Sequence, residues 1–190
     1  GEFLYSPDGT QIAIMTPDSL SLINADGSNR RDSVLESFEA IGFGEYYAFP
    51  QVMWSNDSRA LWLVVNAAEN PYAQHDGAVT VWSLDSQTLT TQEHLTVSAF
   101  YPSAHLSPDG SMLAYWNTDR EGSNTRTMSV INLVSGETLY QNSGALLDFL
   151  GWSPDGQRFL YRDDQSQLWL AGLCGEPTPV AVQNRDSFVT

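Results

Sequence analysis

One five-residue turn, WSPDG at residues 152–156, recurs in close variants at three earlier places in the chain, as YSPDG, WSNDS and LSPDG. In this motif proline presets φ at the first central position of the turn, and aspartate tolerates the bridge conformation at the second. Glycine then supplies the left-handed residue that returns the chain into an antiparallel strand, so each copy predicts a hairpin turn. In WSNDS, which lacks proline and glycine, we expect Asn56 and Asp57 to adopt positive φ. The serine of the motif stands at four positions: Ser6, Ser55, Ser107 and Ser153. This period of 46 to 52 residues favours a propeller or a solenoid over a fold without repeats.

A short apolar run follows each turn and predicts a β-strand, because a helix of that length would be too short. The runs lack polar alternation, so we expect these strands to be buried on both faces. They are IAIM at 12–15, LWLVV at 61–65, MLAYW at 112–116 and FLY at 159–161. Each repeat continues with a second apolar strand, another turn and a polar outer strand. We expect the tryptophans, such as Trp54 and Trp152 at the ends of inner strands, to pack between repeats.

The WSPDG turn, the apolar strand after it and the second strand with its D-G turn resemble the repeat of TolB-type β-propellers, a relative of the WD-repeat blade. The resemblance covers nearly the whole chain. It implies an all-β fold, a β-propeller with four four-stranded antiparallel blades. The expected blade boundaries are about 1–45, 46–98, 99–144 and 145–190. Propellers of this type serve as periplasmic binding proteins, peptidase accessory domains, lyases and surface proteins, so the fold leaves the function open.

Both ends of the sequence read as parts of inner strands. We therefore expect the four blades to belong to a larger propeller of about six to eight blades. The alternative is a small assembly in which the two ends of the chain, or two chains, pair through their open propeller edges.

The charge of the chain limits its partners. It has 23 acidic residues against eight arginines, no lysine, and a formal net charge of -15. Such a surface repels phosphate backbones and anionic headgroups, so we predict no nucleic-acid partner. Without lysine, Schiff-base chemistry is excluded. No segment approaches the roughly 18 apolar residues of a membrane span, so we expect no direct membrane insertion.

The composition is typical of an exported bacterial protein, because lysine is absent and serine, threonine, asparagine and glutamine are abundant. We expect a periplasmic or extracellular location, with the export signal outside this sequence. The single cysteine, Cys174, excludes an internal disulfide.

Long irregular connections gather at one edge of the predicted blades, because the middle connection of a blade and the link to the next blade share that edge. They span 38–50, 66–78, 96–104 and 117–125. Insertions on one face of a repeat protein usually mark its binding face, although ordinary solvated loops explain them equally well. We predict that this face binds a protein, peptide or glycan. The candidate binding residues are Tyr46, Tyr47, Tyr72, His75, Asp76, Tyr101, Asp119 and Arg120.

Catalytic motifs are absent from the sequence. His75 with Asp76, or His105, has the chemistry to join carboxylates around a metal, but the spacing is not that of a metal motif. No nucleophile elbow and no glycine-rich phosphate loop occurs. We therefore predict no catalytic residue, no metal and no cofactor, and a noncatalytic binding scaffold. Two alternatives remain: the propeller accessory domain of a serine peptidase of the prolyl-oligopeptidase type, and, less favoured, a metal-dependent lyase or hydrolase.

Overall fold

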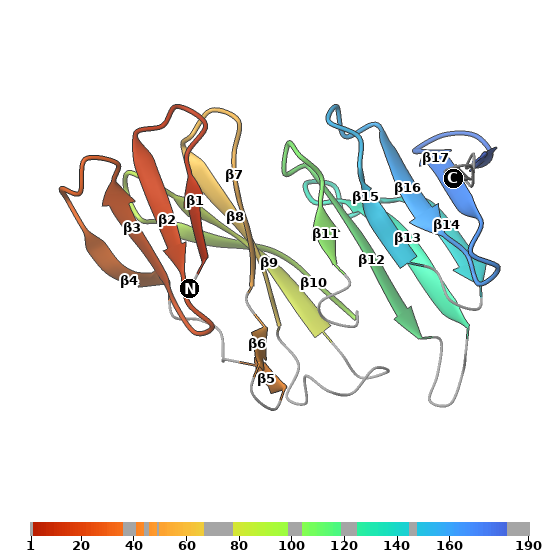
Figure 1. The fold of residues 1–190 in the computed structure, drawn as a ribbon, viewed down its shortest axis with the longest axis horizontal. Helices are drawn as coiled ribbons and strands as arrows, with labels where there is room; N and C mark the ends of the chain where they lie inside the picture. Colours follow the sequence, from red (N-terminus) through yellow and green to blue (C-terminus); the bar gives the residue numbers. More distant parts are fainter. Residues whose placement is uncertain are drawn as a thin grey trace, which may run out of the picture.

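A computed structural model describes residues 2–35, 41–43, 46–48, 50–66, 78–98, 104–118, 125–144 and 148–181, with the backbone alone at 41–43, 46–48, 66 and 117–118. Within these residues the chain contains no helix and forms four four-stranded sheets and one two-stranded sheet, all antiparallel. The four large sheets follow one another in chain order like the blades of a propeller (Figure 1). This arrangement confirms the predicted fold class.

Each large sheet has its strands in chain order. Sheet 1 contains β1 (Glu2–Tyr5), β2 (Gln11–Met15), β3 (Leu20–Asn24) and β4 (Arg31–Leu35). Sheet 2 contains β7 (Gln51–Trp54), β8 (Ala60–Asn66), β9 (Ala78–Asp85) and β10 (Thr91–Ser98).

Sheets 3 and 4 repeat this order. Sheet 3 contains β11 (His105–Leu106), β12 (Met112–Thr118), β13 (Arg126–Asn132) and β14 (Thr138–Gly144). Sheet 4 contains β15 (Asp148–Trp152), β16 (Arg158–Arg162), β17 (Leu168–Gly172) and β18 (Thr178–Val180). The small hairpin between sheets 1 and 2 in the chain pairs β5 (Ile41–Phe43) with β6 (Tyr46–Ala48).

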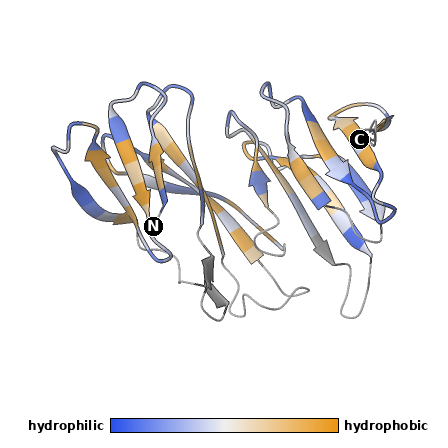
Figure 2. Ribbon diagram, in the orientation of Figure 1, coloured by the Kyte–Doolittle hydropathy of each residue, from blue (hydrophilic) through white to orange (hydrophobic). Residues whose placement is uncertain are grey.

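Among the described residues the core lies between the sheets, in three apolar clusters that each join two neighbouring sheets. Side chains such as Leu22 and Leu61 join sheets 1 and 2, and Val81 and Leu113 belong to the cluster between sheets 2 and 3. Phe159 belongs to the cluster between sheets 3 and 4. Hydrophobic residues accordingly occupy the middle strands of the sheets (Figure 2). Because every internal interface combines two sheets, the stability of one blade depends on its neighbours.

Burial on both faces is confirmed for β8 and β12 only. Consecutive residues are buried there, for example Leu63 with Val64. In β2 and β16 buried and half-buried residues alternate, so Leu160 lies half-buried between the buried Phe159 and Tyr161. The prediction was wrong for these two strands because sheets 1 and 4 pack against a neighbouring sheet on one face only within the described residues.

The two inner-strand tryptophans pack between sheets, as predicted. The Trp54 indole N–H donates to the Leu4 carbonyl at 3.1 Å, and the Trp152 indole N–H donates to the His105 carbonyl at 3.2 Å. Each bond therefore ties the inner strand of one blade to the inner strand of the blade before it.

The four turn motifs form one repeated hydrogen-bond pattern. In every copy the serine Oγ donates to the carboxylate of the aspartate two residues later, at 2.6–2.7 Å. The same Oγ accepts the backbone N–H five residues later, at 2.9–3.0 Å. The turns after β1, β7, β11 and β15 lie along one side of the molecule, at the top of Figure 1. The motif thus closes each inner hairpin with bonds that span at most five residues of the chain.

The WSNDS copy differs from the prediction in one detail. Ser58 has the positive φ, +61°, and neither Asn56 nor Asp57 does. The left-handed conformation belongs to the last position of the motif. Glycine occupies this position in the other copies, for example Gly110 with φ +71°. The Ser58 hydroxyl accepts the backbone N–H of Asp8 at 3.1 Å, and this contact between two turns helps to offset the strain.

Acid is expected to destabilise the turns. Hydrogen bonds, first from Ser153 and then from the Gln157 N–H, hold the pKa of Asp155 below its ordinary value of 3.8, and Ser55 and Ser6 do the same for Asp57 and Asp8. A carboxylate whose folded pKa is depressed stabilises the fold above its unfolded pKa, and this contribution is lost as the pH falls through the folded pKa. We expect the urea midpoint to drop between pH 5 and pH 3. The drop should be smaller in Ser153→Ala, and equal drops would contradict the assignment.

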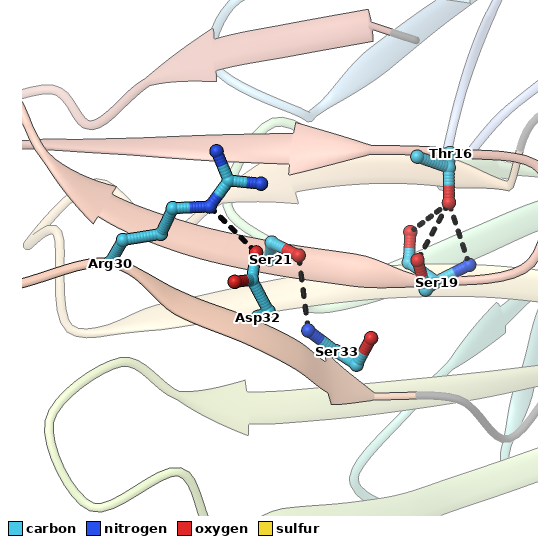
Figure 3. A network of polar contacts seen from close by, with 6 residues as sticks. All are labelled: Thr16, Ser19, Ser21, Arg30, Asp32 and Ser33. Atoms are coloured by element: carbon cyan, nitrogen blue, oxygen red, sulfur yellow. Dashed lines mark hydrogen bonds and ion pairs between the residues drawn. The ribbon is translucent and has the colours of Figure 1, made fainter.

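The outer strand of sheet 1 is attached through a bulge. The register between β3 and β4 shifts between Leu20 and Leu22, and Ser33 has a positive φ of 50° there. The Ser33 N–H donates to the Ser21 Oγ at 3.1 Å, beside the exposed Arg30 to Asp32 ion pair (Figure 3). An exposed pair of this kind contributes about 1 kcal/mol or less, so the bulge depends mainly on the backbone contacts.

Candidate functional site

The binding residues predicted from the sequence fall almost entirely outside the described part of the chain. Tyr46 and Tyr47 lie in β6, opposite Phe43 and Gly42 of β5, with their backbone alone described. The remaining six lie outside the described residues: Tyr72, His75, Asp76, Tyr101, Asp119 and Arg120. Binding through these residues therefore stays a prediction.

A cleft of about 650 Å³ lies between sheets 3 and 4. Its wall on sheet 3 is the outer strand β14, from residue 139 to 144. Its wall on sheet 4 combines β16 and β17 side chains with the connections on either side of β17. These residues are Tyr161, Asp163, Asp164, Trp169, Leu173, Gly175, Glu176 and Pro177. All the bordering strands lie at the end of the molecule that carries the C-terminus (Figure 1).

Two tyrosines and an amide join the walls of the cleft. The Asn142 side-chain amide, on β14, donates to the Tyr161 hydroxyl, on β16, at 3.1 Å. Tyr140, also on β14, meets the Phe159 ring edge-on at 5.0 Å between centroids. Burial, together with the neighbouring Tyr161 hydroxyl, raises the pKa of Tyr140. Tyr140 is therefore protonated at neutral pH and able to donate a hydrogen bond.

A tryptophan and an aspartate form the opposite side. The Trp169 indole N–H donates to Asp163 Oδ2 at 2.8 Å, while Asp163 Oδ1 accepts the backbone N–H groups of Gln165 and Gln167 at 2.9 Å. These bonds, with that of Trp169 the largest cause, hold the pKa of Asp163 below its ordinary value. Asp163 is therefore a stable anion that both closes the β16–β17 connection and orients the indole ring.

The cleft is acidic. Asp163, Asp164 and Glu176 are among the described residues that line it, whereas no arginine is, and the sequence has no lysine. Aromatic rings, amides and carboxylates are groups that accept hydrogen bonds and cations. The site is consequently suited to neutral or positively charged ligands and unsuited to anionic ones.

His105, a candidate metal ligand in the sequence, lies among the described residues and is packed against an aromatic ring. His105 stacks on Phe149, with 4.9 Å between ring centroids and 17° between planes, and burial lowers its pKa. Within the described ranges no cluster of three or more histidine, cysteine, aspartate or glutamate side chains is placed to hold a metal. The same part of the chain has no helix of the length and apolarity that crossing a membrane requires.

The sequence predicts only packing for the aromatic residues of this cleft. Tyr140 and Trp169 do pack against the cluster between sheets 3 and 4, but they also border the cleft, which the sequence did not indicate. The signal available in the sequence was the pair Asp163 and Asp164 directly before a strand with Trp169, after a strand with Tyr140 in the preceding repeat. Nothing in that pattern says that sheets 3 and 4 leave space between them.

No protein-family model and no curated protein matches this sequence. Solved structures resemble it over nearly its whole length. TolB from Acinetobacter baumannii is 15% identical, with a TM-score of 0.52 and coverage of 95% of this chain and 41% of that one. An oligogalacturonate lyase in complex with manganese is 21% identical, with a TM-score of 0.61 and coverage of 92% and 48%. The β-propeller domain of the Trilobed protease from Pyrococcus furiosus, with an open velcro topology, is 12% identical, with a TM-score of 0.61 and coverage of 96% and 57%.

At these identities the likeness establishes the fold alone, and the chain spans about half the length of these structures. The repeated turns, the four blades and the structural neighbours together show that the chain has the fold of a TolB-like β-propeller.

Proposed function

We propose that this chain is a noncatalytic binding scaffold that holds a protein, peptide or glycan partner. The observation that carries the proposal is the cleft between sheets 3 and 4. Its volume of about 650 Å³ falls within the usual range of ligand sites, and its walls combine aromatic rings with a few polar groups. At one end the β16–β17 connection borders the cleft, and this connection occupies the place in its blade that the predicted loops 66–78 and 117–125 occupy in theirs.

Two ionisable groups of the cleft, Asp163 and Tyr140, support a noncatalytic role. A general acid or base works best when its pKa lies near the pH of the reaction. The pKa of Asp163 is lowered and that of Tyr140 is raised, so both move away from neutrality. Their hydrogen bonds hold the walls of the cleft in place, which is what a preformed binding site needs.

Export from the cytoplasm is part of the proposal. Its support is the composition, with eight arginines, no lysine and a charged fraction of 16%. Fractionation of the source cells with an antibody against this chain tests it: the antigen is expected in the periplasmic or extracellular fraction, and a cytoplasmic antigen would refute it.

Ligand binding at the cleft is expected to quench Trp169 fluorescence. The test titrates the protein with neutral oligosaccharides and with short basic, neutral and acidic peptides, and then weighs each ligand by mass spectrometry. Trp169→Phe should lose the quench and bind about fivefold more weakly, that is by ~1 kcal/mol, because it removes the indole ring. Trp82→Phe, in sheet 2, is the matched control and should retain both. A ligand chemically altered by the protein would contradict the noncatalytic role.

A second candidate function is the propeller accessory domain of a serine peptidase. The observation in its favour is the likeness to the Trilobed protease propeller domain, which extends over 96% of this chain. The test is the complete reading frame of the gene. A serine nucleophile elbow with aspartate and histidine partners would favour this candidate, and further blades without such motifs would favour the binding scaffold.

A further inference from the structure

We infer that the cleft takes an extended basic peptide, which pairs with β14 as a fifth strand of sheet 3. This inference rests on the proposed binding function and names the ligand class of the same site. Its three grounds are the open edge of β14, the charge of the cleft and the direction of the side chains along an extended strand.

The edge of β14 lies inside the cleft. β14 is the last strand of sheet 3, so within the described residues its backbone pairs with β13 on one side only. Six consecutive residues of β14, from 139 to 144, line the cleft. A bulge interrupts the pairing at Leu139, and beyond it alternate residues point to opposite faces, so a cleft that touches all five residues from 140 to 144 must reach the backbone edge between the faces. An unpaired edge is a template for a further strand.

Side-chain contacts show which way three consecutive β14 residues point, from residue 141 to 143. Asn142 points toward sheet 4, where it donates to Tyr161. Its neighbours point the other way: the Gln141 amide donates to Ser129 Oγ at 3.5 Å, and Ser143 Oγ lies 2.9 Å from Thr127 Oγ1. Asn142 is thus directed to sheet 4, and Gln141 and Ser143 are directed to side chains of β13. The backbone N–H and C=O groups on the side of β14 away from β13 are the groups that an incoming strand would bond.

Charge favours a basic strand. The cleft contains Asp163, Asp164 and Glu176, and the chain as a whole has a net charge of -15. An arginine side chain beside β14 would meet these carboxylates and the face of the Trp169 ring. Side chains point into the cleft at every second position of an extended peptide. The preferred ligand thus has basic residues in alternation, and uronate or other anionic chains are repelled.

The probe is a seven-residue peptide that alternates arginine and valine, with both ends blocked. We measure its Kd by calorimetry and map amide hydrogen exchange on the protein with and without it. Saturable binding is expected, with slower exchange in 138–144 and no change in the outer strand 91–98 of sheet 2. Citrulline in place of arginine should weaken binding about tenfold, because several exposed ion pairs are lost. Higher salt should weaken it as well.

Matched protein variants separate local charge from total charge. Asp164→Asn with Glu176→Gln should weaken binding of the peptide about threefold or more, because both carboxylates border the cleft. Glu2→Gln with Glu93→Gln removes the same charge from β1 and β10 and should leave the Kd within about twofold. Methylation of alternate peptide nitrogens should abolish binding for the set that faces β14 and spare the other set.

Each result has a definite meaning. Protection of 138–144 together with the charge and methylation effects supports the inference. Peptide binding that protects another strand, or that ignores methylation, overturns it. A neutral oligosaccharide that quenches Trp169 while the peptide does not bind overturns the ligand class and leaves the binding scaffold intact. Failure of every peptide and glycan to bind overturns both the inference and the proposed function.

Discussion

Phe159→Ala is expected to lower the free energy of unfolding by about 3–5 kcal/mol. Phe159 is 1% exposed and lies at the centre of the cluster between sheets 3 and 4. Four aromatic rings from the described part of the chain surround it, with centroids at 5.0–6.3 Å: Tyr140, Phe149, Trp152 and Tyr161. Truncation leaves a cavity that these rigid rings cannot fill by a small shift. Urea denaturation monitored by circular dichroism measures the loss.

The control for this truncation is Leu150→Ala, in the neighbouring strand β15. Leu150 is 48% exposed, so its truncation should change the free energy of unfolding by only about 0.5 kcal/mol. Similar losses in the two variants would show that the aromatic cluster is not a main source of stability. Because Tyr140 borders the cleft and contacts Phe159, Phe159→Ala should also weaken the binding of any ligand in the cleft.

Gly110→Ala is expected to destabilise the fold by about 1–3 kcal/mol more than Gly9→Ala. Both glycines have φ +71°, so alanine meets the same left-handed strain of about 1–2 kcal/mol at either site. The difference is the space for a Cβ. At Gly110 it would lie 2.4 Å from the Trp62 indole nitrogen, whereas nothing lies within 4 Å of one at Gly9. The alanine therefore forces the Trp62 ring to move.

The comparison is measured as the difference between the two urea midpoints. A shift of Trp62 emission in Gly110→Ala, absent from Gly9→Ala, would identify the ring as the group displaced. Equal midpoints would mean that the third turn motif accepts a methyl group without moving sheet 2, and the close approach between these blades would then be irrelevant to stability.

The blades followed from local signals. Serine, aspartate and glycine in the turn motif form bonds that close within a few residues, as at Ser107 and Asp109, so the same letters produce the same hairpin wherever they recur. Apolar runs on either side then supply the strands. One prediction was wrong: the positive φ in WSNDS belongs to Ser58, not to Asn56 or Asp57. The turn requires the left-handed conformation at its last position, and whichever residue stands there adopts it.

The candidate site did not follow from such signals. Trp152 and Trp169 come from the same repeat, and the sequence predicts packing between blades for both. Both pack against the cluster between sheets 3 and 4, but only Trp169 also lines the cleft. Six of the predicted binding residues lie outside the described part of the chain, so the long-loop face stays a prediction.

The turn motifs and the apolar runs of the sequence by themselves determined that this chain forms four-stranded antiparallel blades. Both signals act between residues that are close in the chain, so they can be recognised without the tertiary structure. Only the tertiary structure decided which faces are covered. β2 and β16 alternate in burial and β14 borders an acidic cleft because exposure depends on the space between two sheets. The width of that space depends on how whole blades pack against each other, so it cannot be predicted from a short stretch of sequence.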